Sequence, residues 1–472
     1  MRKITVALYL LLFSNILFGQ QKVNPNIFGL ATSNTFTYFN IYDTLFMQKV
    51  LEISPRVLRF PGGAVGNFYH YNGEAYGFDL DEIDRWHKGG FPKRARGLLK
   101  SSKKMAHNKN YIEDFIHLAK QTNSSVVLVA NIITGDTGEL FLMIDHMKLE
   151  GLNIIGIELG SELSNQSYYL AGFNSDNYIT LSEKFANSIK MKYPDIKIGV
   201  VAAPLVEEKK HRHTLWNKAL QKKNFYDAVI LHSYAKVTKG KSQYGQMIKE
   251  ITEGINKSEM FSLYRNRVIS YFSEFYPQEI TQYKNIFSKP FWITEWNLQI
   301  SRTTGNTLLQ GLFVANYFLE LNTNKVLQEI ELTTFHNLAG RDVSGSIFMN
   351  DGNQTHTHST FLPIKILSDI FQKTDYHSFK TMISPMCNQY DFREVKSAKL
   401  DFSFLINWSD KFIPILIDDK SGNQLIRTEE YFGNNLFVLA SDIDSIKYFK
   451  KDNIQTNELM LKPFSLTKIT YL

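Results

Sequence analysis

Two glutamates, Glu162 and Glu295, each follow a short apolar run of the kind that forms a buried strand. The two runs cover residues 154–159 and 291–294. A carboxylate at such a position contributes little to the packing of the strand, but its side chain can project into a cleft as an acid. Two facing carboxylates are the minimum equipment for cleaving a glycosidic bond. The structural alternatives are a surface-loop acid for Glu162 and a buried ion-pair partner for Glu295.

A series of short apolar runs supplies the elements that must position these acids. The runs alternate with longer amphipathic stretches, which favours a parallel sheet covered by helices. About eight such units are present, the number of a (β/α)₈ TIM barrel, whose active sites lie at the carboxyl ends of the strands. Glu162 then follows the fourth strand and Glu295 the seventh, on the same rim. The predicted strands are Phe28–Thr32, Val57–Phe60, Val126–Ile132, Ile154–Leu159, Ile196–Ala202, Ala228–Ser233, Phe291–Thr294 and Ile330–Phe335.

The stretches between these runs carry apolar residues at helical spacing. In Tyr111–Lys120, for example, Ile112, Phe115, Ile116 and Ala119 fall on one helix face. The segment 248–288 is long for one strand–helix unit, so we expect an extra helix there. The other predicted helices are Ser175–Tyr193, Gln246–Ile255 and Leu308–Leu321.

The pattern changes after a helix-like segment, Phe361–Phe371. Strand-like runs follow without a clear amphipathic helix between them, which predicts a smaller C-terminal antiparallel β-sandwich. The chain is therefore expected to hold an α/β barrel over residues 20–372 and the sandwich over residues 373–472. The predicted sandwich strands are Leu400–Asn407, Phe412–Ile417, Leu436–Ala440 and Leu466–Tyr471.

The N-terminus has the makeup of a cleavable secretory signal over residues 1–19. Arg2 and Lys3 precede an apolar stretch that is too short to span a bilayer. A small residue, Gly19, then marks a candidate cleavage site for signal peptidase. The sequence thus predicts a secreted or periplasmic protein without a membrane span. Cys387 is the only cysteine, so no intrachain disulfide can form.

Composition is that of an ordinary globular protein, with 43% hydrophobic and 21% charged residues. The formal net charge is +7, and basic residues gather between Lys93 and Lys104. Such a run can steer an anionic substrate toward a cleft, or it can be a solvated loop. Nucleic acid is not an expected partner, because the chain carries no recognition motif.

Three motifs carry a resemblance to a known group of enzymes. They are Leu58-Arg59-Phe60-Pro61-Gly62-Gly63, Glu158-Leu159-Gly160-Ser161-Glu162 and Trp292-Ile293-Thr294-Glu295-Trp296-Asn297. The chain resembles clan A of the glycoside hydrolases, the retaining barrel glycosidases, over about residues 25 to 370. The heparanase/β-glucuronidase and α-L-arabinofuranosidase families look nearest.

The resemblance implies that Glu295 is the nucleophile and Glu162 the acid/base. It also implies a polysaccharide or oligosaccharide substrate and no cofactor. The attacking carboxylate must be ionised, whereas the acid must hold its proton until the covalent intermediate forms. The basic run mildly favours an acidic glycan.

Further strand-end residues are candidates for substrate binding. Arg59 could orient Glu295, or form a structural ion pair. By resemblance Tyr234 bonds the nucleophile and His232 contacts sugar hydroxyls, although a lone buried histidine is more often part of the core. Trp296 is either a sugar platform or packing beneath the rim, and His336, with its neighbour Asn337, is a weaker candidate.

Ser161 departs from the clan pattern, which has asparagine directly before the acid/base glutamate. The clan asparagine bonds the sugar 2-hydroxyl, so Ser161 either reaches it through water, or meets a different substrate, or lowers activity. The rival function is a carbohydrate-binding protein on a barrel scaffold that has lost catalysis. A third possibility is a structural surface protein whose sandwich binds glycan.

Two clusters of histidines resemble sets of metal ligands, but their spacing does not support a metal site. They are His211-Arg212-His213 and Thr355-His356-Thr357-His358. Neither has a third ligand at zinc spacing, so no metal is expected.

Overall fold

A computed structural model of the protein describes most of the chain from residue 22 onward. The described ranges are 22–105, 110–205, 210–238, 256–299, 301–340, 345–350, 355–372, 377–381, 390–396, 401–417, 425–441, 445–456 and 458–472. The predicted signal segment 1–19 and the predicted helix Gln246–Ile255 lie outside these ranges.

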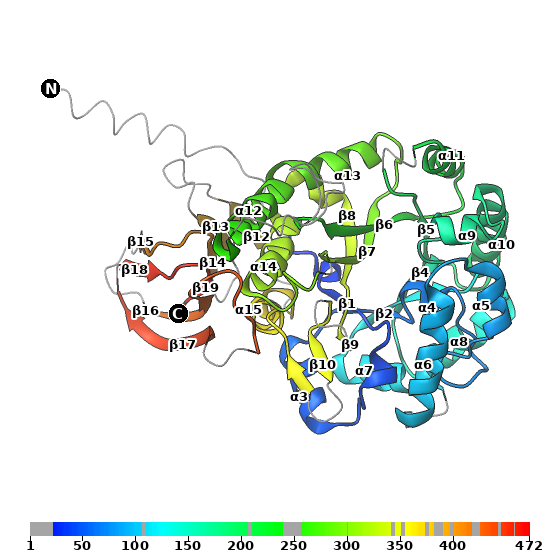
Figure 1. The fold of residues 1–472 in the computed structure, drawn as a ribbon, viewed down its shortest axis with the longest axis horizontal. Coiled ribbons are helices and arrows are strands. Elements are labelled where there is room, and N and C mark those ends of the chain that lie inside the picture. The colour runs from blue at the N-terminus through cyan, green and yellow to red at the C-terminus, as the bar shows by residue number, and fades with distance from the viewer. Residues whose placement is uncertain are drawn as a thin grey trace.

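Eight parallel strands close into a barrel in chain order, with β1 paired to β8. This confirms the predicted barrel, and the helices surround it on the outside (Figure 1). Each predicted barrel strand matches an observed one to within a few residues. The barrel strands are β1 Gly29–Ala31, β2 Val57–Phe60, β3 Ser125–Ala130, β4 Ile154–Leu159, β5 Lys197–Val201, β6 Ala228–Ala235, β7 Phe291–Leu298 and β8 Ile330–Phe335.

Helices follow the strands as predicted, and several begin at a side-chain cap. Asn174, for instance, caps α10 reciprocally with Asn177. The expected extra helix between β6 and β7 is present as α12 and α13, joined by a π-helical turn, Tyr271–Phe275. The larger helices are α3 Thr44–Ile53, α5 Leu80–Trp86, α6 Phe91–Met105, α7 Tyr111–Thr122, α8 Thr137–Leu149, α10 Ser175–Lys192, α11 Lys210–Gln221, α12 Lys257–Ser270, α13 Tyr276–Lys284, α14 Leu308–Thr323 and α15 Phe361–Gln372.

Shorter elements complete the barrel half. Three short strands after β8 form a small separate sheet that the sequence did not predict. They are β9 Ala339–Gly340, β10 Phe348–Asn350 and β11 Thr355–Thr357, and the short helices are η1 Pro25–Ile27, α2 Thr35–Tyr38, α4 Gly63–Gly66, α9 Gln166–Tyr169 and η4 Lys325–Glu329.

Trp292 fills the barrel interior beneath the rim. Its ring lies where a side chain on Gly156 or Gly199 would otherwise stand, since a Cβ built at those glycines would come within 2.4 and 2.9 Å of it. Val127, Ile230 and other strand residues pack around the ring. The barrel is thus a packed core rather than a pore, and polar chemistry is confined to its carboxyl end.

The C-terminal part is an antiparallel sandwich, as predicted. A six-stranded sheet in the order β12-β13-β14-β19-β16-β17 faces a two-stranded sheet, β15-β18. Side chains alternate along β14: Leu405 joins the small core between the two sheets, while Phe404 and Ile406 belong to the main core that continues into the barrel helices. The strands are β12 His377–Thr381, β13 Tyr390–Lys396, β14 Asp401–Asn407, β15 Ile413–Leu416, β16 Leu425–Gly433, β17 Ile446–Gln455, β18 Glu458–Leu461 and β19 Ser465–Tyr471.

One predicted sandwich strand is wrong. Residues Leu436–Ala440 form turns with an isolated bridge from Leu439 to Thr307. Their carbonyl groups instead accept hydrogen bonds from the first turn of α14, where helical N–H groups lack partners within the helix. An apolar run whose backbone carbonyl groups bond to the end of a helix has the same sequence pattern as a strand. The division at residue 372 remains a prediction, although α15 ends there and β12 begins at His377.

Candidate active site

The carboxyl ends of four barrel strands bring charged side chains to one point. Alternation along β2 and β4 places Arg59 and Glu158 on the inward positions above Val57 and Gly156. On β6 the same alternation turns His232 and Tyr234 inward. These residues stand above the apolar layer around Trp292, so their charges lie where the barrel opens.

A β-bulge positions Glu295. The pairing register shifts between Leu231 and His232 against β7, and again between Ile293 and Trp296 against β8. Bulges redirect side chains locally. Here the shift sets Glu295 opposite His232, whereas strict alternation from Trp292 and Thr294 would point it out of the barrel.

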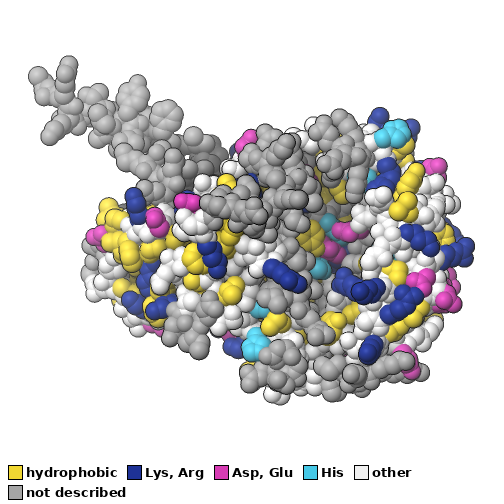
Figure 2. Space-filling view, in the orientation of Figure 1, with side chains coloured by type: hydrophobic (Ala, Val, Ile, Leu, Met, Phe, Trp, Pro, Cys, Tyr) yellow, Lys and Arg dark blue, Asp and Glu magenta, His cyan; other side chains and the backbone are white. Residues whose placement is uncertain are grey.

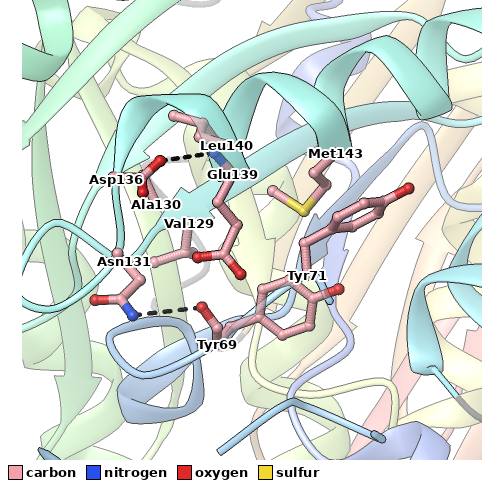
Figure 3. Close-up of a pocket in the computed structure, with 10 residues that line it drawn as sticks. Tyr69, Tyr71, Val129, Ala130, Asn131, Asp136, Glu139, Leu140 and Met143 are labelled. Carbon is pink, nitrogen blue, oxygen red and sulfur yellow. Dashed lines mark hydrogen bonds between the residues drawn. The ribbon is translucent and has the colours of Figure 1, made fainter. Parts of the chain in front are cut away.

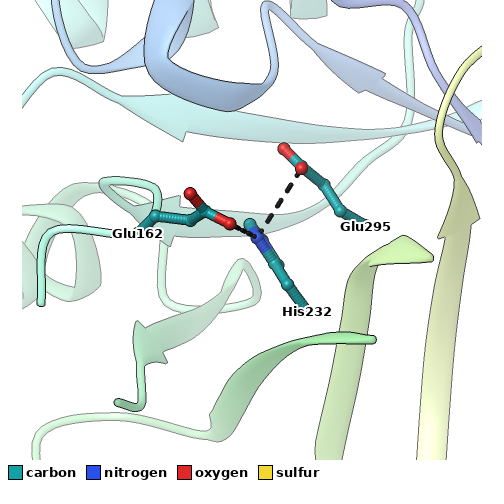
Figure 4. A group of neighbouring side chains, drawn as sticks. All are labelled: Glu162, His232 and Glu295. Carbon is teal, nitrogen blue, oxygen red and sulfur yellow. Dashed lines mark hydrogen bonds and ion pairs between the residues drawn. The ribbon is translucent and has the colours of Figure 1, made fainter. Parts of the chain in front are cut away.

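Glu162 and Glu295 meet across this opening (Figure 4). A carboxylate oxygen of each and a ring nitrogen of His232 all lie within 4.8 Å of one another. Glu162 Oε1 lies 3.0 Å from His232 Nδ1, and Glu295 Oε2 lies 3.7 Å from the same atom. The two acids that the sequence singled out therefore share one site.

Arg59 ties the site together from below. Its Nε and Nη2 donate to the two oxygens of Glu158, each at 2.8 Å, and its Nη1 donates to Glu295 Oε1 at 2.8 Å. Both Arg59 and Glu158 are fully buried. A buried arginine of this kind holds carboxylates in one geometry, because the planar guanidinium binds them in a fixed fork.

The surroundings of Glu295 keep it ionised. Burial alone would raise its pKa, but the positive charges of His232 and Arg59, and the hydrogen bond from Arg59, hold the pKa well below its usual range. Tyr234 donates its hydroxyl proton to Glu295 Oε2 at 2.8 Å. Burial and the Glu295 carboxylate raise the pKa of Tyr234 well above 10, so this tyrosine stays a neutral donor.

His232 carries a proton in this arrangement. Burial would lower its pKa, but Glu295, Glu158 and Glu162 outweigh that effect and raise the pKa to about 10. Its Nε2 lies 3.2 Å from the hydroxyl of Thr294, which fixes the ring plane. A protonated imidazole thus stands in contact with Glu162 at neutral pH.

The segment that carries Glu162 is held in an unusual backbone conformation. Gly160 has φ 76° and Glu162 has φ 52°, a region that costs a non-glycine residue free energy. Asn67, fully buried, fastens the segment by bonding both the N–H and the carbonyl of Ser161, each at 2.7 Å. Asn165 Nδ2 donates to Glu162 Oε2 at 2.8 Å, and the Glu162 side chain remains 46% exposed.

Two of the other candidates lie at the site. The Ser161 hydroxyl is buried and accepts from Arg59 Nη2 at 3.2 Å, so it faces the arginine. His336 packs edge-on against the Tyr234 ring, with centroids 6.2 Å apart. Burial lowers the pKa of His336, so it is neutral at physiological pH.

Trp296 is not a sugar platform, contrary to that expectation. It is fully buried, and its ring stacks on Tyr317 of α14 with centroids 3.8 Å apart. The bulge that turns Glu295 inward leaves Trp296 on the outer face of β7, where it packs against the surrounding helix.

Sequence reasoning gave no role to Glu158 or Asn67. Glu158 carried a signal, since it is a lone charge within an apolar strand, four residues before Glu162. Asn67 had none, because only the fold brings it beside Ser161.

The three residues Glu162, His232 and Glu295 are close enough to hold a metal ion. The side chains around these three residues argue against a metal site. Arg59 and Tyr234 already bond the two oxygens of Glu295, and the guanidinium puts a positive charge where an ion would stand. The arrangement suits acid–base and nucleophilic chemistry better.

A separate, small pocket lies between the end of β3 and α8 (Figure 3). Tyr69, Tyr71, Asn131 and Glu139 are among its lining residues. Beside it His70 bridges Glu139 and Glu82, each at 3.0 Å. Neither catalytic candidate lines this pocket.

In the described part of the chain, no helix has the length and apolarity needed to cross a membrane.

Solved structures share this architecture. A GH51 arabinofuranosidase from Xanthomonas axonopodis pv. citri has TM-score 0.65 and 10% identity, covering 97% of this chain and 98% of its own. A 4-O-α-L-rhamnosyl-β-D-glucuronidase from Fusarium oxysporum 12S has TM-score 0.60 and 11% identity, covering 96% and 97%. A GH30 endoxylanase from Clostridium papyrosolvens C71 has TM-score 0.51 and 10% identity, covering 96% and 98%.

The chain has the fold of clan A glycoside hydrolases. The likeness extends over the barrel and the sandwich together, as the coverage shows. No protein-family model and no curated protein matches the sequence. The specific link to heparanase is not among these findings and remains a prediction.

Proposed function

We propose that this chain is an exported retaining glycoside hydrolase that cleaves a polysaccharide or oligosaccharide by double displacement. The observation that carries the proposal is the pair Glu162 and Glu295, whose carboxylates approach within 4.8 Å. Retaining enzymes hold their two carboxyl groups about 5–5.5 Å apart, whereas inverting enzymes need about 6.5–9.5 Å to admit a water. The neighbours, named for arabinofuranosides, a glucuronide and xylan, support a carbohydrate substrate.

In the first step Glu295 attacks the anomeric carbon. It is suited to this because its pKa is held low and its two oxygens are fixed by Arg59 and Tyr234. The bond to the leaving oxygen breaks as that oxygen takes a proton from Glu162. The product is a covalent glycosyl-enzyme.

His232 supports the acid role of Glu162. Its Nδ1 holds a proton 3.0 Å from Glu162 Oε1, and Glu162 takes up that proton as it protonates the leaving oxygen, which leaves His232 neutral. In the second step Glu162 removes a proton from water as the water oxygen attacks the anomeric carbon from the face that the leaving group vacated, and the bond between that carbon and Glu295 breaks, which frees the carboxylate. Configuration is therefore retained.

The decisive experiment is trapping of the intermediate. An activated 2-deoxy-2-fluoro glycoside forms the intermediate rapidly and releases it slowly, so peptide mass spectrometry of the inactivated protein should show the sugar on Glu295. Glu295→Ala should be inactive, and azide should restore turnover of an activated aryl glycoside with an inverted glycosyl azide as product. Wild-type turnover in Glu295→Ala would refute the role.

The rival is a binding protein that has lost catalysis, and Ser161 favours it because the clan places asparagine there. Such a protein would bind glycans yet leave activated aryl glycosides intact and Glu295 unlabelled. If the sandwich alone were the binding part, residues 373–472 would retain the glycan affinity of the whole chain.

Export rests on the sequence of residues 1–19. We propose that this segment directs secretion and is then removed. N-terminal sequencing of protein recovered from the periplasm or medium tests this: a mature chain that begins near residue 20 agrees with it, and a cell-retained chain that starts at Met1 contradicts it.

A further inference from the structure

The basic run between Lys93 and Lys104 forms a helix beside the active site, not a loop. Phe91, Ala95 and Leu98 are buried at helical spacing and fix one face of α6 against the barrel half. The exposed face then carries the cations. Figure 2 shows Lys and Arg side chains over α6, next to the hollow in which acidic and histidine side chains are visible.

The exposed side chain of Arg94 forms no hydrogen bond or ion pair with any residue that the structure describes, and only its backbone N–H donates, to the carbonyl of Gly90. Arg96, two positions further along, binds Asp84. Both arginines are exposed. The difference matters because the paired arginine has a structural partner, whereas the unpaired one leaves its full charge and donors for a ligand.

The charge of Arg94 reaches the site. Burial is the main reason that the pKa of His336 is low, and Arg94 lowers it further, ahead of Arg59 and His232. Arg94 also acts on the buried Tyr76, whose hydroxyl donates to the carbonyl of Ser33 after β1. Because α6 packs against α2, the helix that directly follows β1, the geometry agrees with a position of Arg94 near the β1 and β8 ends of the barrel.

Unsatisfied polar atoms lie at the same two strand ends. Within the described ranges, the buried His336 Nδ1 and Ser33 Oγ have no hydrogen-bond partner. The Ser33 hydroxyl is near Arg59, since a Cβ on Gly62 would meet both within 3.5 Å. Buried polar atoms without partners are uncommon in folded proteins, and a bound sugar would supply what they lack.

The other cations of the site are already engaged. Arg59 bonds Glu158 and Glu295, and His232 bonds Glu162. A substrate with a negative charge would meet the carboxylates of Glu162 and Glu295, which repel it. An unpaired cation such as Arg94 can offset that repulsion.

Given the proposed glycosidase function, we propose that Arg94 binds the carboxylate of a uronic acid residue seated in the active site. His336 and Ser33 then take hydroxyl groups of the same sugar. Arg94 is a specificity residue here: it selects acidic over neutral sugars and takes no part in the bond change.

The test compares each acidic polysaccharide with its carboxyl-reduced form, which replaces the carboxylate by a primary alcohol. Glucuronoxylan, gum arabic and polygalacturonate fragments are titrated calorimetrically into full-length Glu295→Gln, alone and combined with Arg94→Ala or with Arg96→Ala. Arg96→Ala is the matched control, because it removes an equal charge from the same helix, about 200° away around its axis, where the side chain binds Asp84.

For at least one native fragment, binding should be about 10–100-fold tighter than for its reduced form, the range expected for hydrogen bonds to a charged group. Arg94→Ala should abolish that difference and Arg96→Ala should keep it. Equal binding of native and reduced fragments throughout, or a difference that survives Arg94→Ala, overturns the inference. Failure of wild-type turnover with this binding preference intact would instead count against the hydrolase proposal.

Discussion

Two histidines in the described part of the chain each contact more than one glutamate, and the geometry around them differs. His232 meets Glu162 and Glu295 at the same nitrogen, Nδ1, at 3.0 and 3.7 Å. His70 meets Glu139 at Nδ1 and Glu82 at Nε2, each at 3.0 Å. In the first cluster the two carboxylates therefore face each other, and in the second the imidazole ring separates them.

The supporting residues differ in the same way. Glu82 and Glu139 lie in the first turns of α5 and α8, so His70 fastens one helix to the other. Glu162 and Glu295 come from strand ends, and Arg59 and Tyr234 hold Glu295 in place. One Glu–His–Glu group is a clamp, whereas the other keeps two acids close together with one accessible face. Composition alone does not separate a structural cluster from a catalytic one.

Replacing one glutamate from each cluster gives the largest contrast. Glu295→Gln should lower kcat by about 10⁴-fold or more, the scale of losses when a nucleophile is removed. Glu139→Gln should leave kcat unchanged, because that carboxylate only clamps helices. Initial rates on an activated aryl glycoside measure both. A comparable loss in the two variants would mean that the clusters do not divide the roles in this way.

The two histidines come next. His232→Asn should reduce kcat by about 10²-fold, within the range for acid–base partners, because Glu162 loses its proton store. His70→Asn should lower the free energy of unfolding by about 1–3 kcal/mol and spare kcat, since two partly buried carboxylates lose their partner. Denaturant titration and steady-state rates separate these outcomes, and a kcat defect in His70→Asn contradicts the clamp role.

Two tyrosine hydroxyls probe a smaller effect. Tyr234→Phe removes one bond to the charged Glu295 and should cost about 10–100-fold in kcat. Tyr71→Phe is the control, since Tyr71 lines the other pocket and its hydroxyl lies 3.0 Å from His146 Nδ1. If both variants keep full activity, the Tyr234 bond does not position the nucleophile.

The pH dependence of stability should be the smallest effect. The pKa of His232 is raised from 6.5 to about 10 and that of His70 from 6.5 to about 9, in the latter case mainly by the hydrogen bond to Glu139. A raised folded-state pKa contributes stability that is fully present below pH 6.5 and is lost as pH rises. The melting temperature should fall between pH 6.5 and 10.

His70→Asn identifies the contribution of the clamp to this fall. The variant should melt lower than wild type at pH 6, with the gap closing by pH 9–10. A gap that stays constant across the range would show that His70 is not charged in the folded protein.

Much of the barrel was predictable because local rules govern it. Both faces of a barrel strand are buried, so the strands are near-continuously apolar and their positions were found within a few residues. The basic run was harder: its buried positions, Phe91, Ala95 and Leu98, recur at helical spacing, but the charges between them read as a solvated loop. Leu436–Ala440 failed because tertiary hydrogen bonds to α14, not a strand partner, satisfy its backbone.

The chain order of strand ends determined which residues can reach the rim, and so the sequence by itself indicated Glu162, Glu295, Arg59, His232 and Tyr234. The tertiary structure decided the rest. A bulge in β7, set by pairing with β6 and β8, sends Glu295 inward and Trp296 outward, and no local pattern reports such a register shift. Glu158 and Asn67 acquire their partners, Arg59 and Ser161, only when segments 99 and 94 residues apart in sequence are brought together. Distances between side chains depend on closure of the whole barrel, which is a property of all eight strands at once.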